Sequence, residues 1–101
     1  MIYNVILSDD AYRDLANLSD VIKFKFHAPI TAFKYGKELR VLLESLSTSA
    51  TIYQIQTNPF IVRQYGNFVR RVNYKKMAVL YSVYGNTVYI LRVIPQSTIA
   101  N

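Results

Sequence analysis

The segment at residues 63–94, RQYGNFVRRVNYKKMAVLYSVYGNTVYILRVI, decides the fold because its pattern predicts three consecutive strands. Apolar, β-branched and aromatic residues dominate 68–74, 77–84 and 87–94, the composition expected of strands. Lys75-Lys76 lies at the first bend and Gly85-Asn86 at the second. Gly and Asn tolerate the positive φ that a two-residue hairpin turn requires. The segment is therefore predicted to form three strands joined by tight turns.

The same segment holds six of the twelve basic residues of the chain and no acidic residue. They are Arg63, Arg70, Arg71, Lys75, Lys76 and Arg92. The whole chain carries a net charge of +6, with an isoelectric point near 9.7. A sheet does not require charges of one sign, so this cluster favours a polyanionic partner: RNA, DNA or an acidic protein segment. The alternative is a small basic protein whose charge serves solubility alone.

Upstream of the meander, the pattern predicts one strand and two helices. Residues 2–7 alternate weakly and form the strand. Ser8, followed by two aspartates, is a typical helix start, and apolar residues then recur three or four apart until residue 22. This helix is expected to fray near His27, because Pro29 disfavours helical geometry in the residue before it.

Pro29 opens the second predicted helix, whose apolar spacing continues to Leu46. The small polar residues at 45–51, SLSTSAT, are predicted to be a loop, and 52–55 a short extended piece. Asn58-Pro59 and Gly66-Asn67 indicate turns. The order strand, helix, helix, three strands predicts one α+β domain over 1–101: a helical hairpin packed on one face of a small, largely antiparallel sheet.

Composition excludes several functional classes. The apolar runs are of strand length, and the N-terminus has no basic leader, so we expect a cytoplasmic protein without a membrane span or signal peptide. The chain has no cysteine, a single histidine (His27) and no clustered carboxylates, so no metal and no cofactor is expected. Glycines are scattered singly, which excludes a phosphate-binding glycine loop.

Strand alternation sorts the basic residues between two faces of the predicted sheet. It directs Arg70 towards the helices, and Arg71 and Arg92 to the opposite face, beside Asn73 and Ser82. The helices are expected to cover two rows of residues: Met77, Val79 and Tyr81, and Tyr89, Leu91 and Val93. A guanidinium on a rigid strand can bind phosphate through two hydrogen bonds. In the alternative, each arginine lies over apolar neighbours with its charged end in water.

Four stretches together resemble a known family: SDDAYRDLANLSDVI at 8–22, LRVLLESL at 39–46, G-x-x-x-R-R-V at 66–72 and VLYSVYGNTVYILRVI at 79–94. The chain resembles the RelE/ParE superfamily of toxins from type II toxin–antitoxin systems, often called plasmid stabilisation proteins. The likeness spans residues 2–97 and is most specific at 78–93. It implies a helical hairpin on a small sheet, a basic face, and a cognate acidic antitoxin that forms a hetero-oligomer with the toxin.

The RelE-like branch of this superfamily cleaves mRNA on the ribosome by attack of a ribose 2′-OH on the adjacent phosphate. This chemistry needs an oriented hydroxyl, stabilised negative charge and a protonated leaving oxygen. The resemblance then implies catalytic roles for Arg71, Arg70 and Arg92. It assigns substrate binding to Arg63, Lys75, Lys76 and Gln96.

The chain departs from the nuclease pattern at two places. Ala78 stands where RelE-like nucleases carry an arginine, and the sequence PQST at 95–98 follows the last strand where they place arginine, histidine or tyrosine. The ending I-L-R-V is closer to the ParE branch, whose members inhibit DNA gyrase. The function predicted first is a ribosome-dependent mRNA endoribonuclease. The alternatives are a gyrase inhibitor without catalysis and a non-toxic relative that binds an antitoxin.

Overall fold

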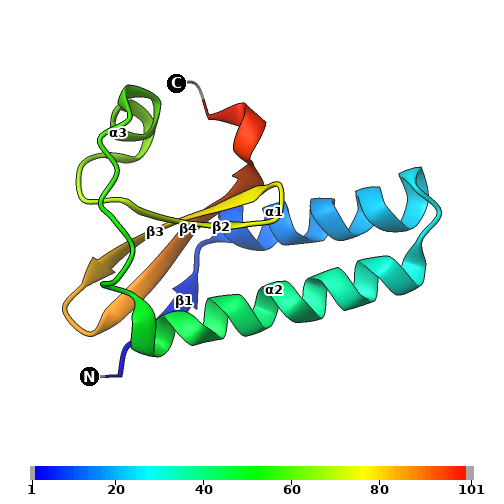
Figure 1. Ribbon diagram of the computed structural model, residues 1–101, viewed down its shortest axis with the longest axis horizontal. Helices are drawn as coiled ribbons and strands as arrows, with labels where there is room; N and C mark the ends of the chain where they lie inside the picture. Colours follow the sequence, from blue (N-terminus) through cyan, green and yellow to red (C-terminus); the bar gives the residue numbers. More distant parts are fainter. Residues whose placement is uncertain (1, 100–101) are drawn as a thin grey trace.

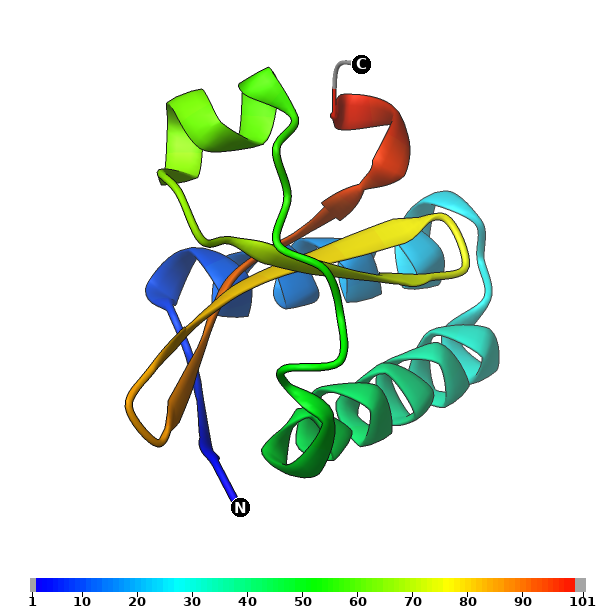
Figure 2. The same ribbon diagram turned by 60° about the vertical axis from the view of Figure 1, so that its left-hand side comes forward.

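The computed structural model describes residues 2–99 and arranges them as a four-stranded sheet with helices on both faces (Figures 1 and 2). The elements in chain order are β1 Asn4–Leu7, α1 Asp9–Asp20, the π-helical turn η1 Val21–Lys25, α2 Pro29–Ser49, α3 Pro59–Tyr65, β2 Arg70–Tyr74, β3 Met77–Tyr84, β4 Thr87–Pro95 and the 3₁₀ turn η2 Gln96–Thr98. The strand order is β1-β4-β3-β2, with β1 parallel to β4 and the other pairs antiparallel. The predicted α+β architecture is confirmed.

The beginning and the end of the chain are joined at Ser8, between β1 and α1. The Ser8 Oγ accepts a hydrogen bond of 3.0 Å from the backbone N–H of Ala11 and so caps α1 as predicted. The same hydroxyl donates to the carbonyl of Leu91 at 2.8 Å, and the Ser8 N–H donates to the Ile90 carbonyl at 2.9 Å. The start of α1 is therefore fixed against the middle of β4.

The main core lies between the helical hairpin and one face of the sheet. Leu39, Leu43 and Leu46 of α2 are almost fully buried there. They contact the sheet residues Val79 and Tyr81, which were predicted to lie under the helices. The amphipathic spacing of α2 thus matches the alternation of β3, and this layer is built as the sequence indicates.

Helix α2 extends further than predicted, because residues 45–49 are helical rather than a loop. The small polar side chains do not break the helix, since their hydroxyls bond to carbonyls of the preceding turn: Ser45 to Leu42 at 2.5 Å and Ser49 to Ser45 at 2.9 Å. Leu46 and Ala50 are both fully buried. Burial of apolar side chains here outweighs the weak helix propensity of serine and threonine.

Helix α3 was not predicted, although its two ends were read as turns. The Asn58 Oδ1 accepts from the N–H of Phe60 at 2.8 Å, and Pro59 occupies the first helical position. Gly66 ends the helix at φ 87°, a conformation that glycine adopts without strain. The turn signals therefore mark the boundaries of a two-turn helix.

Helix α3 and the C-terminal turn cover the face of the sheet that was expected to be open (Figure 2). A second core fills this layer, made of Ile61, Val69, Ala78, Leu80, Ile94 and Ile99. Leu80 is fully buried between Arg71 on β2 and Arg92 on β4. Both arginines lie on this face as predicted, but the face between them is apolar and covered.

The predicted alternation of β4 is wrong for Tyr89 and Leu91. Val88, Ile90 and Val93 are the β4 residues packed under the helical hairpin. Leu91 contacts the second core instead, and Tyr89 remains partly exposed. A strict period of two thus fails in the middle of this strand.

A β-bulge explains the change of face. The register shifts between Leu80 and Tyr81, which pair with Arg92 and Ile90 respectively, so Leu91 is an additional residue on β4. One additional residue resets the alternation beyond it. Val93 therefore faces the helical hairpin, although Leu91, two residues earlier, does not.

Candidate functional site

Arg70 lies on the helical side of the sheet and holds the end of α2. Its Nη1 donates to the carbonyls of Tyr53, at 2.6 Å, and Thr51, at 3.2 Å, just beyond the last turn of α2. On the neighbouring strand, the buried Tyr81 hydroxyl donates to the Ala50 carbonyl at 2.5 Å. A cation and a hydroxyl thus satisfy three carbonyls at a helix C-terminus, where positive charge is favourable.

Arg71 points to the opposite side of the sheet and makes a different kind of contact. Its Nε donates to the Oδ1 of Asn73 at 2.8 Å, in a hydrogen bond exposed to solvent. An amide neither accepts nor supplies a proton in catalysis. Arg71 is therefore available to an anion, but without an acid–base group in that contact.

These two adjacent arginines are expected to differ in their effect on stability. Arg70→Ala should lower the free energy of unfolding by about 2 kcal/mol, because hydrogen bonds from a charged group to backbone carbonyls are lost. Arg71→Ala should change it by less than about 0.5 kcal/mol. Denaturant unfolding of both variants checks this, and equal effects would contradict the assignment of Arg70 to the α2 terminus.

Arg92 is held by an acidic residue of α1. Its Nε and Nη2 donate to the two carboxylate oxygens of Asp14 at 2.7 and 2.9 Å, and the Asp14 Oδ2 also accepts from the N–H of Val93 at 2.9 Å. The Asp14 side chain is 12% exposed. The hydrogen bonds to Asp14 raise the pKa of Arg92, which stays charged. The guanidinium therefore fixes α1 to β4 where β1 has ended.

Lys75 belongs to a cluster that attaches the β2–β3 turn to α2. Its ammonium lies 3.5 Å from the Glu38 carboxylate and 5.2 and 5.4 Å from the ring centres of Tyr35 and Tyr74. The Tyr74 hydroxyl donates to Glu38, which lowers the pKa of that carboxyl and raises the pKa of the phenol. Lys75 thus has an acidic neighbour within the chain.

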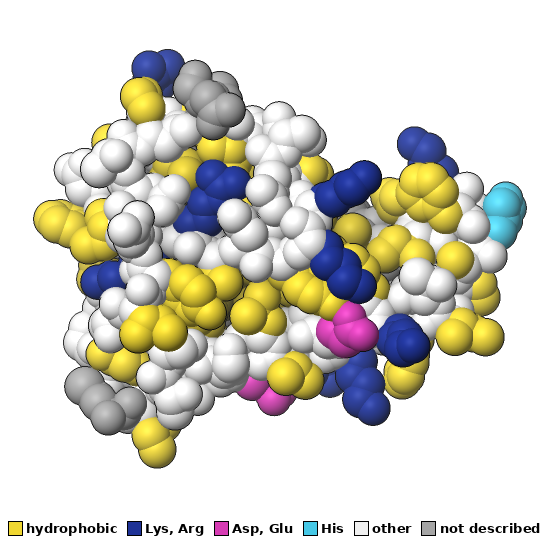
Figure 3. Space-filling model, viewed as in Figure 1, with side chains coloured by type: hydrophobic (Ala, Val, Ile, Leu, Met, Phe, Trp, Pro, Cys, Tyr) yellow, Lys and Arg dark blue, Asp and Glu magenta, His cyan; other side chains and the backbone are white. Residues whose placement is uncertain are grey.

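The remaining predicted residues do not join one site. Lys76 and Gln96 lie near Lys75, because the Gln96 side chain donates to the Lys75 carbonyl at 2.6 Å and the Gln96 N–H to that of Lys76 at 2.8 Å. Arg63 is exposed on α3. Figure 3 shows basic side chains gathered towards the helical hairpin and separated from one another over the sheet and α3. The seven predicted residues are thus divided among several surfaces.

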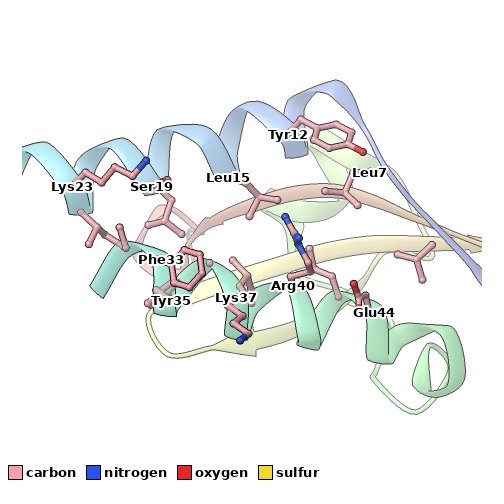
Figure 4. Close-up of a pocket in the computed structure, with 17 residues that line it drawn as sticks. Leu7, Tyr12, Leu15, Ser19, Lys23, Phe33, Tyr35, Lys37, Arg40 and Glu44 are labelled. Carbon is pink, nitrogen blue, oxygen red and sulfur yellow. The ribbon is translucent and has the colours of Figure 1, made fainter. Parts of the chain in front are cut away.

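A groove with a volume of about 910 Å³ lies between α1 and α2 (Figure 4). Its lining is mostly apolar and includes Leu15 and Phe33 from the two helices. Lys23, Lys37 and Arg40 add positive charge, with Glu44 near one end. Figure 4 shows that both helices contribute side chains to this space.

The groove residues were not predicted from the sequence, because the apolar stripes of both helices were interpreted as core. A stripe alone does not show whether the two helices close on each other. Phe33 gave a usable signal: it lies beside Gly36 and Lys37 on α2, outside the Leu39–Leu43–Leu46 stripe, and is 72% exposed. A large aromatic residue that is exposed to solvent is typical of a binding surface rather than of a core.

The fold is that of known toxins. The chain is similar to a structure of the chromosomal ParDE toxin–antitoxin system from P. aeruginosa, with a TM-score of 0.75, 17% identity and coverage of 93% of this chain and 96% of that one. It is also similar to the RelBE2 toxin–antitoxin complex from Mycobacterium tuberculosis, with a TM-score of 0.61, 19% identity and coverage of 95% and 100%. The YafQ protein of E. coli gives a TM-score of 0.50 at 12% identity, covering 98% and 99%. No curated protein matches the chain.

Fold and sequence together define a small toxin of the RelE/ParE superfamily, as the sequence resemblance predicted. A family model described as "ParE toxin of type II toxin-antitoxin system, parDE" matches residues 5–100. The chain therefore belongs to the ParE toxin family and is the toxin component of a type II toxin–antitoxin system. None of the helices described in residues 2–99 combines the length and apolarity required to cross a membrane.

Proposed function

We propose that this toxin acts in the cytoplasm by binding DNA gyrase, without cleaving RNA, and that an acidic antitoxin neutralises it by occupying the groove between α1 and α2. The claim that the toxin does not cleave RNA depends on the groups that the three arginines contact. Arg70 holds the end of α2, and Arg71 donates to the amide of Asn73. Arg92 is paired with Asp14 and also donates to the Tyr65 hydroxyl at 3.4 Å, so all three guanidinium groups bind acceptors within the fold. Attack by a 2′-OH requires groups that take up and supply a proton as well as a cation.

The location of the single histidine agrees with a binding mechanism. His27 lies in the connection between η1 and α2. This connection is at the end of the helical hairpin that extends away from the sheet (Figure 1). A proton transfer coupled to phosphate stabilisation needs both groups within hydrogen-bond reach of one substrate. Membership of the ParE family favours the same conclusion. Cleavage of mRNA by Arg71, Arg70 and Arg92 stays a prediction that the experiment below also tests.

Charge and shape support the antitoxin site. Lys23, Lys37 and Arg40 line an apolar groove, and an acidic amphipathic segment would place apolar side chains on its floor and carboxylates against these cations. The similar P. aeruginosa and M. tuberculosis structures are of a toxin–antitoxin system and a toxin–antitoxin complex. An acidic partner from the adjacent reading frame is the occupant we propose for this chain.

A gyrase supercoiling assay tests both parts of the proposal. Purified toxin should inhibit supercoiling, and added antitoxin should restore it. Combined Lys37→Glu and Arg40→Glu should leave inhibition intact but require about tenfold more antitoxin for recovery, because opposite charges in the groove become like charges. Lys76→Glu, an exposed substitution on the β2–β3 turn, is the matched control and should behave as the wild type.

A translation reaction with ribosomes and a reporter mRNA tests the alternative, that the toxin cleaves mRNA. Transcripts cut within codons, together with unaffected supercoiling, would replace the gyrase proposal by the nuclease. A toxin that affects neither reaction and still binds the antitoxin would be the non-toxic relative. If the same amount of antitoxin restored supercoiling with the wild type and with the double charge variant, the groove would not be the antitoxin site.

A further inference from the structure

The end of the helical hairpin carries large apolar side chains that face solvent. Phe24 is 70% exposed, Phe26 65% and Ile30 82%, and Lys25 and Lys34 beside them are also exposed. These five residues are called the hairpin tip. Figure 3 shows hydrophobic and basic side chains together at this end of the molecule. Adjacent apolar side chains left in water on a small protein are typical of an interaction surface.

A hydrogen-bonded backbone presents the tip. In η1 the Phe26 N–H donates to the Val21 carbonyl at 3.3 Å, and the Ala28 N–H donates to the Ile22 carbonyl at 3.1 Å. His27 then reverses the chain with φ at 51°, a conformation that L-residues adopt at a cost. Short π-helical turns are frequent at functional sites. The phenylalanines are thus held outward by defined structure.

The tip residues contribute to neither core and do not line the groove. None of the five belongs to the two clusters of buried residues or to the apolar residues packed against them. The groove lining includes Lys23 and Phe33 but none of the tip residues. Folding and the proposed antitoxin site therefore leave these side chains without a function.

The charge of the tip defines its partner. Lys25 and Lys34 are the lysines of the tip, and the sequence between Asp20 and Glu38 contains no acidic residue. A partner that accepts this surface must offer carboxylates for the lysines and an apolar recess for Phe24, Phe26 and Ile30. A phosphate backbone supplies the charge but no contact for the aliphatic Ile30. The observations favour a protein over a nucleic acid.

A bilayer fits the arrangement less well. Helices that lie on membranes separate their apolar residues and their lysines onto two faces. Lysine and phenylalanine alternate from Lys23 to Phe26, the residue that follows η1, and consecutive residues of a helical turn point in different directions. Basic and apolar side chains are therefore mixed around the tip. Exposed phenylalanines fit a protein interface better, because aromatic residues are enriched there.

We propose that the hairpin tip is the surface by which this toxin engages its protein target, at an acidic recess lined by apolar side chains. This rests on the proposed function, in which the toxin acts by binding gyrase. The target and the antitoxin then contact different, neighbouring surfaces of the helical hairpin. Phe24 and Phe26 are the anchors, and Lys25 and Lys34 give the orientation by pairing with carboxylates.

Binding of purified gyrase to immobilised toxin tests the proposal. Phe24→Ala combined with Phe26→Ala should weaken binding by about tenfold or more, as expected for aromatic anchors, and Lys25→Glu combined with Lys34→Glu should do the same by charge reversal. Val41→Ala with Ile52→Ala is the matched control, because these exposed apolar residues lie elsewhere and are 62% and 74% exposed. Antitoxin binding and the unfolding midpoint should be unchanged in all variants.

The outcomes separate the two proposals. Wild-type toxin that does not bind gyrase would overturn the proposed function. Wild-type binding that the tip variants retain in full would overturn the tip while the gyrase proposal stands. Binding of wild type to phosphatidylglycerol vesicles or to a DNA duplex, lost in the phenylalanine variant whose gyrase binding persists, would assign the tip to a membrane or to a nucleic acid instead.

Discussion

Replacing Asp14 by alanine is expected to lower the free energy of unfolding by about 3 kcal/mol, the scale observed when one partner of a buried ion pair is removed. The carboxylate accepts three hydrogen bonds, two from Arg92 and one from the N–H of Val93. Without it, a guanidinium that is 32% exposed loses its counter-ion, and a backbone donor on β4 loses its acceptor. Denaturant unfolding of the wild type and the variant measures this difference, provided that the free energy of unfolding depends on denaturant concentration with the same slope in both.

The same helix provides the control. Asp10 forms a 3.3 Å ion pair with Arg13, but their side chains are 64% and 75% exposed. Exposed pairs contribute little, so Asp10→Ala should change the free energy of unfolding by less than about 0.5 kcal/mol. In an Arg92→Ala background, Asp14→Ala should cost less than in the wild type, because the two residues interact directly. Additive costs would contradict the role given to the pair.

Alkaline pH is expected to destabilise the protein through Tyr81. Burial of this hydroxyl raises the pKa of Tyr81 to about 12, whereas an unfolded tyrosine titrates near its ordinary value of 10.0. Between pH 10 and pH 12 the unfolded chain loses the Tyr81 proton, whereas the folded protein keeps it. The contribution of this residue to the free energy of unfolding is therefore fully present below pH 10 and is lost as the pH rises towards 12. The loss from this residue should be about 2 kcal/mol.

Tyr81→Phe isolates this contribution. The variant should be less stable at pH 8, because the hydrogen bond to the Ala50 carbonyl is lost, yet its stability should decline less between pH 10 and 12. Tyr84→Phe is the matched control and should leave the pH profile as in the wild type, because this tyrosine is 66% exposed. Parallel pH profiles for wild type and Tyr81→Phe would contradict the assignment.

The elements that the sequence predicted best are those encoded by local patterns. Gly85-Asn86 forms the predicted hairpin turn between β3 and β4, with Gly85 at φ 58°. Lys75-Lys76 forms the other bend, and the alternation of β3 assigns its faces correctly. A turn or a regular strand depends on residues next to one another, so a single sequence contains the necessary information.

The features that the sequence did not predict depend on distant residues. The ion pair of Asp14 was not predicted, because its partner Arg92 lies 78 residues away in the sequence. The bulge at Leu91 follows from fitting β4 between two strands and the start of α1, which no local pattern of β4 encodes. Helix α3 is shorter than the window over which helical periodicity can be recognised.

The candidate site was predicted only in part for the same reason. The sequence grouped six basic residues because they are close along the chain, and strand alternation correctly separated Arg70 from Arg71. It did not show that Arg70 and Arg92 are bound to acceptors within the protein. Conversely, the groove arises from the spacing between α1 and α2, a tertiary property that the apolar stripes do not specify.

The parallel pairing of β1 with β4 determines when the toxin can fold during its synthesis. The first strand has no hydrogen-bonding partner in the sheet until the last strand has been synthesised, and the contacts of residues 8–14 with 90–93 close a loop of nearly the whole chain. Such non-local topologies form late and slowly. A ribosome-bound fragment that ends before residue 87 therefore lacks a complete sheet. The toxin can fold only after the ribosome has translated the last strand.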